Sequence, residues 1–534
     1  MPKSMKLALI IILALFLRLY SLHSLPPALF SDEVDIANQV RTFRQSQSDY
    51  YGNRFPIHFH SFSDWRTPLA IYSSVFISYF TSDPVLIVRL PSVFFSLLSI
   101  IFFYLITDSL LAAFLLALSP WSLHFGRTGF EVSGMLFTIL AGLFFWLKYH
   151  RFPKIIYLYL SLIFFCLSPY FYSTAKLFLI LLWPLLLIIW PKTIFKLKTK
   201  NIIFLIFTGI LMLSPMLVDT LRGHAGFRFS YISIFTEPHR EQITDTLRYQ
   251  DILLSHPNEI GVKTPFLSFI FHNKYQLILE KFTKNFLSSF STNFLFLRGD
   301  ENLRQGFGNH GLLYIIDFFL IFIGIILHFK KPTKLGVFFL FFLLLSPIPF
   351  ALTRDSASPH ATRLIFMIFP LLYFSSLALK KYLYLFPFYL LFFINFWHHY
   401  TIHYPQISAR YWHYNLKEAI LAAKETNSET IYFSDTAESF LPFFLLYFPY
   451  PVPNTSNIIA KIAPFASPSF IGSELDQRFF FGRLNWSNLS DLPTESLIVA
   501  PESNQNLFPA ELKIIKKIDK KYIEAEAFYL LQKQ

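Results

Sequence analysis

The chain has 534 residues, of which 54% are hydrophobic and only 15% are charged, and 67 of them are phenylalanine. Since soluble domains carry about a quarter charged residues, this composition excludes an ordinary soluble protein and indicates a membrane protein. The formal net charge of +13 does not indicate nucleic-acid binding, because the basic residues lie mostly in short clusters between apolar runs. With a single cysteine, Cys166, the chain can form neither an internal disulfide nor a Cys-based metal site.

The first apolar run lies close to the N-terminus and is not predicted to be a cleaved signal peptide. It contains Arg18, lacks a small-x-small exit and is followed by many further hydrophobic segments. Many apolar runs are long enough to cross a bilayer as helices, although several have only about 16 to 18 residues, at the short end of the spanning range. The predicted spans lie at 5–22, 86–107, 109–125, 130–148, 155–171, 175–190, 201–219, 311–329, 335–351, 364–379 and 382–397.

The basic connections between the spans predict the orientation of the chain. They lie at residues 1–6, 148–154, 191–200, 328–334 and 380–381. If the short apolar stretch at 68–80 is re-entrant, all of these connections face the cytoplasm, as the positive-inside rule requires. If 68–80 were a full span, the last four would face outward. The sequence therefore predicts about eleven spans, which place the charged motifs at 31–35, 125–131, 168–176 and 352–363 on the outer face.

The region after residue 402 changes character and predicts a small α/β domain of about 130 residues, a usual domain size. The run at 413–428 is typical of an amphipathic helix, and 437–448 of a second helix, whereas 429–435 and 495–501 are typical of strands. The predicted fold is an all-α polytopic membrane domain over 1–402, with outer loops at 23–68 and 220–310, followed by an extracytoplasmic α/β domain at 403–534.

The stretch FSDEVDIANQV follows the first span and places three carboxylates within four residues, at Asp32, Glu33 and Asp35. One interpretation is a helix start capped by Ser31, where acidic side chains favour the positive end of the helix dipole. Such a start would also fix a carboxylate rigidly, as a general base requires. Because neighbouring helical residues diverge by about 100°, only one of Asp32 and Glu33 can point into a site.

Other charged residues lie at the outer ends of spans. Arg127 and Glu131 in GRTGFEVSG are four residues apart, hence on one helix face, where they either pair with each other or serve a site. A charge within the hydrocarbon costs about 3 kcal/mol, so a buried one normally has a role. Arg18 either extends to the interface or pairs with Asp32 or Glu33.

The motif DWRTPLAIY places Asp64 and Arg66 just before a helix that starts at Pro68. Arg66 would then stand at a positive helix end, where a phosphate binds favourably. The alternative is an interfacial Trp–Arg anchor. Lys176 and Arg363 add positive charge on the outer side.

In combination, these motifs resemble the GT-C fold glycosyltransferases, a class of polytopic enzymes that use lipid-phosphate-linked sugars. The nearest branches are the protein O-mannosyltransferases and the lipid A aminoarabinose transferases. The resemblance covers about residues 5–380 and is carried by SDE (31–33), PLAIY (68–72), VRLPSVFFSLLSIIFFYLI (88–106) and LSPWSLHFGRTGFE (118–131).

The resemblance implies that Asp32 is the general base for the acceptor hydroxyl, with Glu33 as the reserve candidate. It also implies that Arg127 binds the donor phosphate and that Glu131 occupies a second acidic position, where family members often have Asp. The predicted substrate-binding residues are Arg127, Glu131, Arg66, Asp64, Lys176 and Arg363.

The implied donor is a polyprenyl-phosphate sugar, and the implied acceptor is a hydroxyl of a protein, a lipid or a cell-wall glycan. The reaction would take place on the extracytoplasmic face of the cell membrane. Some members of the family use a divalent cation, but the sequence shows no ligand set for a metal.

Two rival interpretations make different predictions. A polytopic lipid or sugar transporter should show internal repeats and broken helices near the membrane centre, whereas the charges of this chain gather at the outer face. A non-catalytic envelope scaffold that displays the tail domain predicts that Asp32→Asn has no effect.

Overall fold

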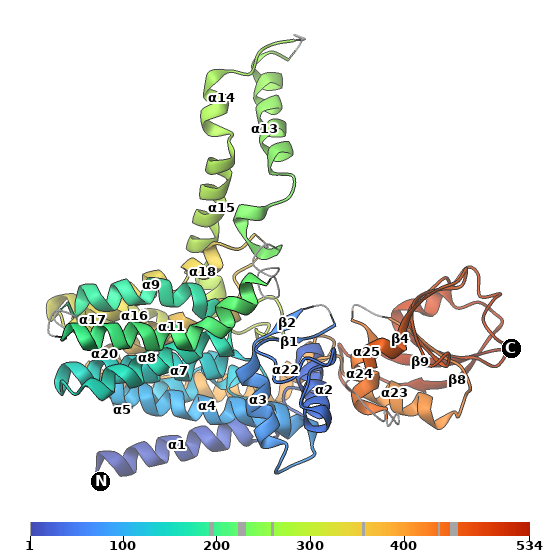
Figure 1. The fold of residues 1–534 in the computed structure, drawn as a ribbon, viewed down its shortest axis with the longest axis horizontal. Coiled ribbons are helices and arrows are strands. Elements are labelled where there is room, and N and C mark those ends of the chain that lie inside the picture. Colours follow the sequence, from blue (N-terminus) through green and yellow to red (C-terminus); the bar gives the residue numbers. More distant parts are fainter. Residues whose placement is uncertain are drawn as a thin grey trace.

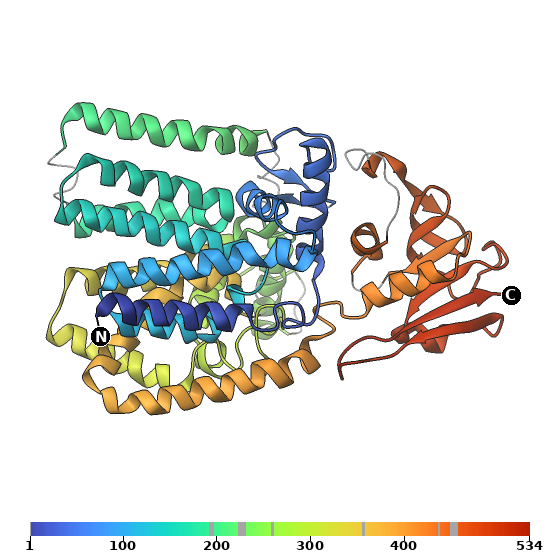
Figure 2. The same cartoon turned by 90° about the horizontal axis from the view of Figure 1, so that it is seen from below.

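A computed structural model describes residues 2–62, 64–191, 197–222, 231–257, 261–354, 358–435, 438–448 and 458–534. The long helices run side by side in one bundle, a β-sheet domain lies beyond one end of it, and a helical arm projects sideways (Figure 1). The predicted fold class, apolar helices followed by a C-terminal α/β domain, is therefore confirmed. Figure 2 shows the N-terminus at the end of the bundle away from the sheet domain.

Each predicted span falls on one helix or on consecutive helices of the bundle. These helices are α1 (Lys3–Leu19), α4 (Pro84–Thr107), α5 (Leu110–Leu118), α6 (Pro120–Phe125), α7 (Val132–Arg151), α8 (Ile155–Phe171), α9 (Thr174–Ile189), α11 (Thr199–Leu221), α16 (Ile315–Lys330), α17 (Lys334–Leu345), α18 (Ile348–Ala351), α19 (Ala361–Leu364), α20 (Ile368–Lys381) and α21 (Phe386–His398). Among the described residues, helical segments at 84–107, 132–151, 199–221, 334–351 and 361–381 are each long and apolar enough to cross a bilayer. The protein is an integral membrane protein.

The stretch at 68–80 forms the short helix α3 (Pro68–Ile77), which has 10 residues. At 1.5 Å per residue it is about 15 Å long, half the thickness of the hydrocarbon core. This length agrees with the re-entrant interpretation, while the orientation of the chain stays a prediction.

The surroundings of Arg18 match neither expectation, that it reaches the membrane interface or that it pairs with Asp32 or Glu33. The side chain has no exposed surface, and its Nε donates to Ser96 Oγ at 2.5 Å. The remaining nitrogens donate to Ala117 O at 3.2 Å and to Ser122 Oγ at 3.0 Å, among others. Arg18 therefore neither extends to the interface nor pairs with Asp32 or Glu33, because polar groups inside the bundle satisfy it.

Several short elements cover the end of the bundle that faces the sheet domain. They are α2 (Ser31–Ser46), the antiparallel strands β1 (Phe59–His60) and β2 (Trp65–Arg66), and α3. The predicted outer loop at 220–310 contains η1 (Ile234–Thr236), α13 (Arg240–Ser255), α14 (Phe266–Phe271), α15 (Lys274–Ser288) and η2 (Asn293–Leu297). Helices α13 to α15 form the arm in Figure 1.

The C-terminal domain is a seven-stranded sheet with the order β4-β5-β6-β3-β7-β9-β8. Strand β3 is parallel to β6 and β7, and the other pairs are antiparallel. After η5 (His399–His403) and α22 (Tyr404–Ser408), the elements are α23 (Leu416–Glu425), β3 (Ile431–Ser434), α24 (Phe440–Tyr447), α25 (Ile458–Lys461), β4 (Ile462–Ala466), β5 (Phe470–Leu475), β6 (Phe479–Leu484), β7 (Leu497–Pro501), η7 (Glu502–Leu507), β8 (Leu512–Ile518) and β9 (Phe528–Lys533). The two predicted helices and two predicted strands match α23, α24, β3 and β7.

The sheet domain is attached to the bundle through α24, which packs on α2. Leu29 and Val34 belong to the same hydrophobic cluster as the buried residues of α23 and α24. Asn38 Nδ2 donates to Pro442 O at 2.8 Å, and Arg41 donates to Leu445 O at 2.5 Å. Helix α2 thus lies between the two parts of the protein.

Candidate active site

Helix α2 begins at Ser31, and Phe30 occupies the N-cap position without a side-chain hydrogen bond. The predicted cap by Ser31 is therefore wrong by one residue. Because successive residues of a helix point in different directions, Glu33 lies in different surroundings from Asp32 and Asp35, which share a partner.

Glu33 is enclosed by the protein. Neither Glu33 nor its partner Arg89 has exposed side-chain surface, and the two carboxylate oxygens accept from Arg89 Nε and Nη2 at 3.0 Å. The amide of Gly129 also donates to Glu33 Oε1 at 2.7 Å. This geometry gives Glu33 no surface that an acceptor hydroxyl could reach.

Arg89 also fixes the segment that links α1 to α2. Its guanidinium donates to Leu22 O at 2.8 Å, to Pro26 O at 3.2 Å and to Ala28 O at 2.6 Å. The Arg89–Glu33 pair thus positions the start of α2. The motif VRLPS contains this arginine, but the sequence alone does not show its partner.

Arg66, on β2, interacts with three other carboxylates, those of Asp32, Asp35 and Glu131. It donates to Asp32 Oδ1 at 2.7 Å and to Asp35, and its Nη1 lies 3.9 Å from Glu131 Oε1. Burial alone would lower the pKa of the Arg66 guanidinium, but Asp32, Asp35 and Glu131 raise that pKa well above its usual range. Arg66 is therefore a permanent cation.

Among these carboxylates, Asp32 is the accessible one. Its side chain is 49% exposed, against 5% for Asp35 and 12% for Glu131. Arg66 holds one oxygen of Asp32 while part of the carboxylate faces solvent. A carboxylate fixed on one side and accessible on the other can accept a proton from a bound hydroxyl.

A cavity of about 440 Å³ opens next to this cluster. Four of the predicted substrate-binding residues line it, namely Asp64, Glu131, Lys176 and Arg363. They come from the β1–β2 turn, the segment before α7, α9 and α19, so the fold gathers residues that are far apart in the sequence. Apolar walls are provided by Leu177, Ile180, Ile232, Pro349 and Leu352. Residues 355–357 of the predicted motif at 352–363 lie outside the described residues.

The cavity is also lined by His58, which the sequence did not single out. His58 Nδ1 lies 2.5 Å from Asp219 Oδ2 at the end of α11. This contact ties the segment before β1 to α11, beside the cavity. No local pattern around His58 indicates this pairing, because its partner is 161 residues away.

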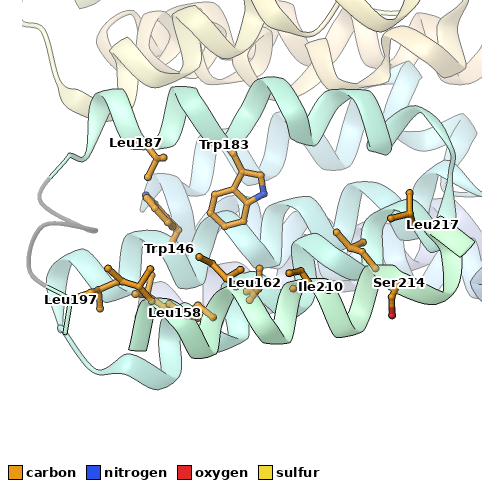
Figure 3. A pocket seen from close by; sticks show the side chains of 14 residues that line it. Trp146, Leu158, Leu162, Trp183, Leu187, Leu197, Ile210, Ser214 and Leu217 are labelled. Atoms are coloured by element: carbon orange, nitrogen blue, oxygen red, sulfur yellow. The ribbon is translucent and has the colours of Figure 1, made fainter. Parts of the chain in front are cut away.

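A second cavity, of about 550 Å³, lies between α7, α8, α9 and α11. Figure 3 shows that the side chains around it are almost entirely apolar, with Trp146 and Trp183 among them. Helices α9 and α11 contribute to both cavities, Ile180 and Thr220 to the first and Trp183 and Leu217 to the second. The same two helices therefore border both cavities, the apolar cavity and the first one, which we call the charged cavity.

Arg127 is placed differently from the expectation. It lies in the turn between α6 and α7 rather than on a helix face, and it does not pair with Glu131. It donates to the backbone oxygens of Leu17, Tyr20 and Leu25, the last two at 2.5 and 2.9 Å. The side chain is fully buried and is not among the residues that line the charged cavity.

The chain between Arg127 and Glu131 is not one continuous helix, and at Gly129 its backbone lies very close to the side chains of Val88 and Glu33. A Cβ atom on Gly129 would lie 2.3 Å from Val88 and 2.9 Å from Glu33. The chain therefore passes α4 and α2 at a distance that only glycine allows.

On the exposed side of Asp32 lie Glu438 and His413 of the C-terminal domain and Arg304, which precedes α16. Glu438 Oε1 lies 3.7 Å from Arg304 Nη1 and 3.8 Å from His413 Nε2. Burial, with a further contribution from Asp32, raises the pKa of Glu438 above its usual value despite Arg304. Burial and Arg304 lower the pKa of His413 to about 3, so this imidazole is neutral. Sequence analysis missed these residues because they lie hundreds of positions from Asp32.

The residues present do not fit a divalent cation. Within the described parts of the chain, no three His, Cys, Asp or Glu side chains converge as a metal site requires. Beside the cavity, Asp32 and Asp35 are paired with Arg66. The mechanism proposed below therefore uses protein side chains alone.

No family model and no curated protein sequence matches the chain. Among solved structures, it is similar to an oligosaccharyltransferase of Archaeoglobus fulgidus, solved in complex with Zn and sulfate. The identity is 16%, the match covers 87% of this chain and 59% of the archaeal one, and the TM-score is 0.41. This chain thus spans 59% of the length of that protein.

The chain is also similar to ArnT from Cupriavidus metallidurans. For the apo structure the identity is 11%, the coverage is 99% of this chain and 97% of ArnT, and the TM-score is 0.39. For the structure bound to undecaprenyl phosphate, the corresponding values are 11%, 99%, 98% and 0.42. Since these TM-scores lie below 0.5, residue roles in this chain rest on its own geometry.

Proposed function

We propose that the protein is a GT-C type membrane glycosyltransferase that transfers a monosaccharide from a polyprenyl-phosphate donor to an acceptor hydroxyl. The reaction would take place on the outer face of the cell membrane. The observation that carries the proposal is the accessible carboxylate of Asp32, held by Arg66 next to a cavity of about 440 Å³ that Lys176 and Arg363 line.

The charged cavity suits the phosphate of the donor. Cationic side chains aimed at a leaving phosphate stabilise the charge that develops as its bond to the sugar breaks. Lys176 and Arg363 supply this charge, and the apolar walls accept the first part of a lipid chain. The apolar cavity lies further along the same two helices, α9 and α11, where it offers more apolar surface to such a chain.

Asp32 supplies the base. In the proposed step, Asp32 takes the proton of the acceptor hydroxyl, the acceptor oxygen bonds to the anomeric carbon, and the bond from that carbon to the phosphate oxygen breaks. The phosphate leaves with the electron pair. A single displacement of this kind inverts the anomeric carbon. Arg66 keeps Asp32 oriented through their ion pair.

Other predicted site residues receive supporting roles in this proposal. Glu131 lies between Arg66 and the cavity, where it can bind sugar hydroxyls, and Asp64 lines the same cavity. Glu33 and Arg127 position the chain between α1 and α2 through buried contacts. The acceptor would approach Asp32 from the side of Arg304, His413 and Glu438.

The test compares the glycoconjugates of cell envelopes that contain wild-type protein, Asp32→Asn or no protein, by mass spectrometry. Loss of a general base typically costs a factor of about 10² to 10⁴ in rate, so we expect Asp32→Asn to match the envelopes without the protein. The matched control is Asp108→Asn, which changes an exposed carboxylate paired with Lys3 at the opposite end of the bundle. If a correctly folded Asp32→Asn protein keeps full transfer, the proposal is wrong.

A further inference from the structure

The arm formed by α13, α14 and α15 projects roughly at right angles to the long helices of the bundle (Figure 1). Seen from below, it lies behind the bundle and points away from the viewer (Figure 2). Since the long helices cross the bilayer, an element perpendicular to them runs parallel to the membrane plane. Its depth in the membrane then depends on where its root is attached.

The root of the arm is fixed at the ends of the spans. Asn285 Nδ2, on α15, donates to Thr353 O at 2.8 Å and to Ala351 O at 3.4 Å, at the end of α18. The backbone of Arg354 donates to Ile232 O at 2.8 Å, just before η1. The arm therefore leaves the bundle at the level where the spans end, which is the boundary between hydrocarbon and headgroups.

Polar contacts hold the arm together from within. Arg248 Nε donates to His272 O at 2.8 Å, and His272 Nε2 lies 3.0 Å from Asp251. Lys281 also lies 2.7 Å from Glu237. These contacts join α13 to the end of α14, and α15 to the end of η1, so the helices form one unit while many of their apolar side chains point outward.

The exposed surface of the arm changes along its length. Near the root, α13 exposes Glu241, Gln242, Asp245 and Thr246, and two large apolar side chains, Phe235 and Leu287, are exposed there as well. Towards the far end, the exposed side chains are large and apolar, and we call them the tip cluster. The tip cluster consists of Leu253 (43% exposed), Leu254 (83%), Phe266 (77%), Leu267 (62%), Phe269 (48%), Ile270 (48%), Phe271 (59%) and Tyr275 (71%).

Contact with the bilayer would explain why the side chains of the tip cluster are apolar although they are exposed on the protein surface. Contiguous apolar patches of this kind are rare on protein surfaces that face water and mark membrane or protein contacts. Elements with apolar side chains on one part and polar ones on another lie in the interface of a bilayer.

We propose that the tip cluster inserts into the outer part of the bilayer on the side that carries α2, so that the partner of the arm is the lipid surface itself. The polar part of α13 then stays in the headgroup region. Ile232 and Ser233, at the root, line the charged cavity. The arm therefore holds the opening of that cavity at the membrane surface. This inference does not depend on the proposed glycosyl transfer.

Site-directed fluorescence quenching tests the proposal, and the single cysteine makes the labelling simple. In a Cys166→Ala background, an environment-sensitive fluorophore is attached at Leu254→Cys or Phe269→Cys in the tip cluster. The matched control is Gln242→Cys, on the polar part of the same arm. The full-length protein is reconstituted in phosphatidylcholine vesicles that contain lipids with a quencher on the acyl chain.

We expect the lipid quencher to reduce fluorescence at the two tip positions several-fold more than at the control. Aqueous iodide should show the opposite order. Equal iodide quenching at all three positions would show a tip exposed to water and would overturn the proposal. Tip protection that disappears on dilution of the protein in the same lipid would show contact between protein copies, and would also overturn it.

Discussion

The substitutions Asp32→Asn and Glu33→Gln should have different effects, because Asp32 is proposed to act in the reaction whereas Glu33 stabilises the fold. Glu33 has no exposed side-chain surface, and both of its oxygens bind Arg89 at 3.0 Å. Glu33→Gln therefore leaves the Arg89 guanidinium as a buried charge without its counter-ion, at a cost of about 3 to 5 kcal/mol. Asp32 is 49% exposed and paired with Arg66 at 2.7 Å. Because exposed pairs contribute at most about 1 kcal/mol, Asp32→Asn should leave stability almost unchanged.

Cys166 provides the assay for stability. It is the only cysteine of the chain and is 3% exposed, so a thiol-reactive fluorogenic dye reports unfolding as detergent-solubilised protein is heated. We expect Glu33→Gln to unfold at a clearly lower temperature than wild type. Asp32→Asn should unfold at the wild-type temperature and lose glycosyl transfer. A Glu33→Gln protein as stable as wild type would refute the reasoning from the buried ion pair.

Three further predictions concern other parts of the protein. Lys176→Met should weaken donor binding about tenfold to a hundredfold by removing a charged contact to phosphate, in a competition assay with polyprenyl phosphate; unchanged affinity would remove Lys176 from the site. Glu438→Gln should alter the KM for the acceptor and not the KM for the donor, and equal changes in both would contradict the acceptor side assigned to it. Burial raises the pKa of Asp435 to about 6 from 3.8. The folded state therefore holds its proton more tightly, and this carboxyl makes the sheet domain less stable as the pH rises from about 4 to 6. Asp435→Asn keeps an acceptor for the Phe440 amide and should remove that loss, as thermal unfolding at pH 4.5 and pH 7 would show; an unchanged pH dependence would speak against it.

The spans were predictable because hydropathy along one segment does not depend on its partners. In the sheet domain, β3 and β7 were recognisable as buried apolar runs. Strand β8 was not, because the run LKIIKKI is largely exposed at the edge of the sheet and rich in lysine. Edge strands carry little of the apolar pattern by which strands are recognised.

The roles of the charged residues depend on long-range pairing, which sequence spacing does not reveal. The motif at 31–35 indicated a site with one chemical and one structural carboxylate, but only the positions of Arg66 and Arg89 show which is accessible. The pairing expected for Arg127 and Glu131 assumed a continuous helix, but the chain is not helical between α6, which ends at Phe125, and α7, which begins at Val132.

The packing of α24 on α2 has a consequence for biosynthesis. Asn38 and Pro442, which are hydrogen-bonded to each other, are separated by 404 residues. A ribosome releases α2 early, so Leu29 and Val34 lack their native neighbours until the far end of the chain emerges. Folding of the region around Asp32 is therefore completed after nearly all the spans have been inserted. A chain released before residue 440 would carry the bundle without a finished site.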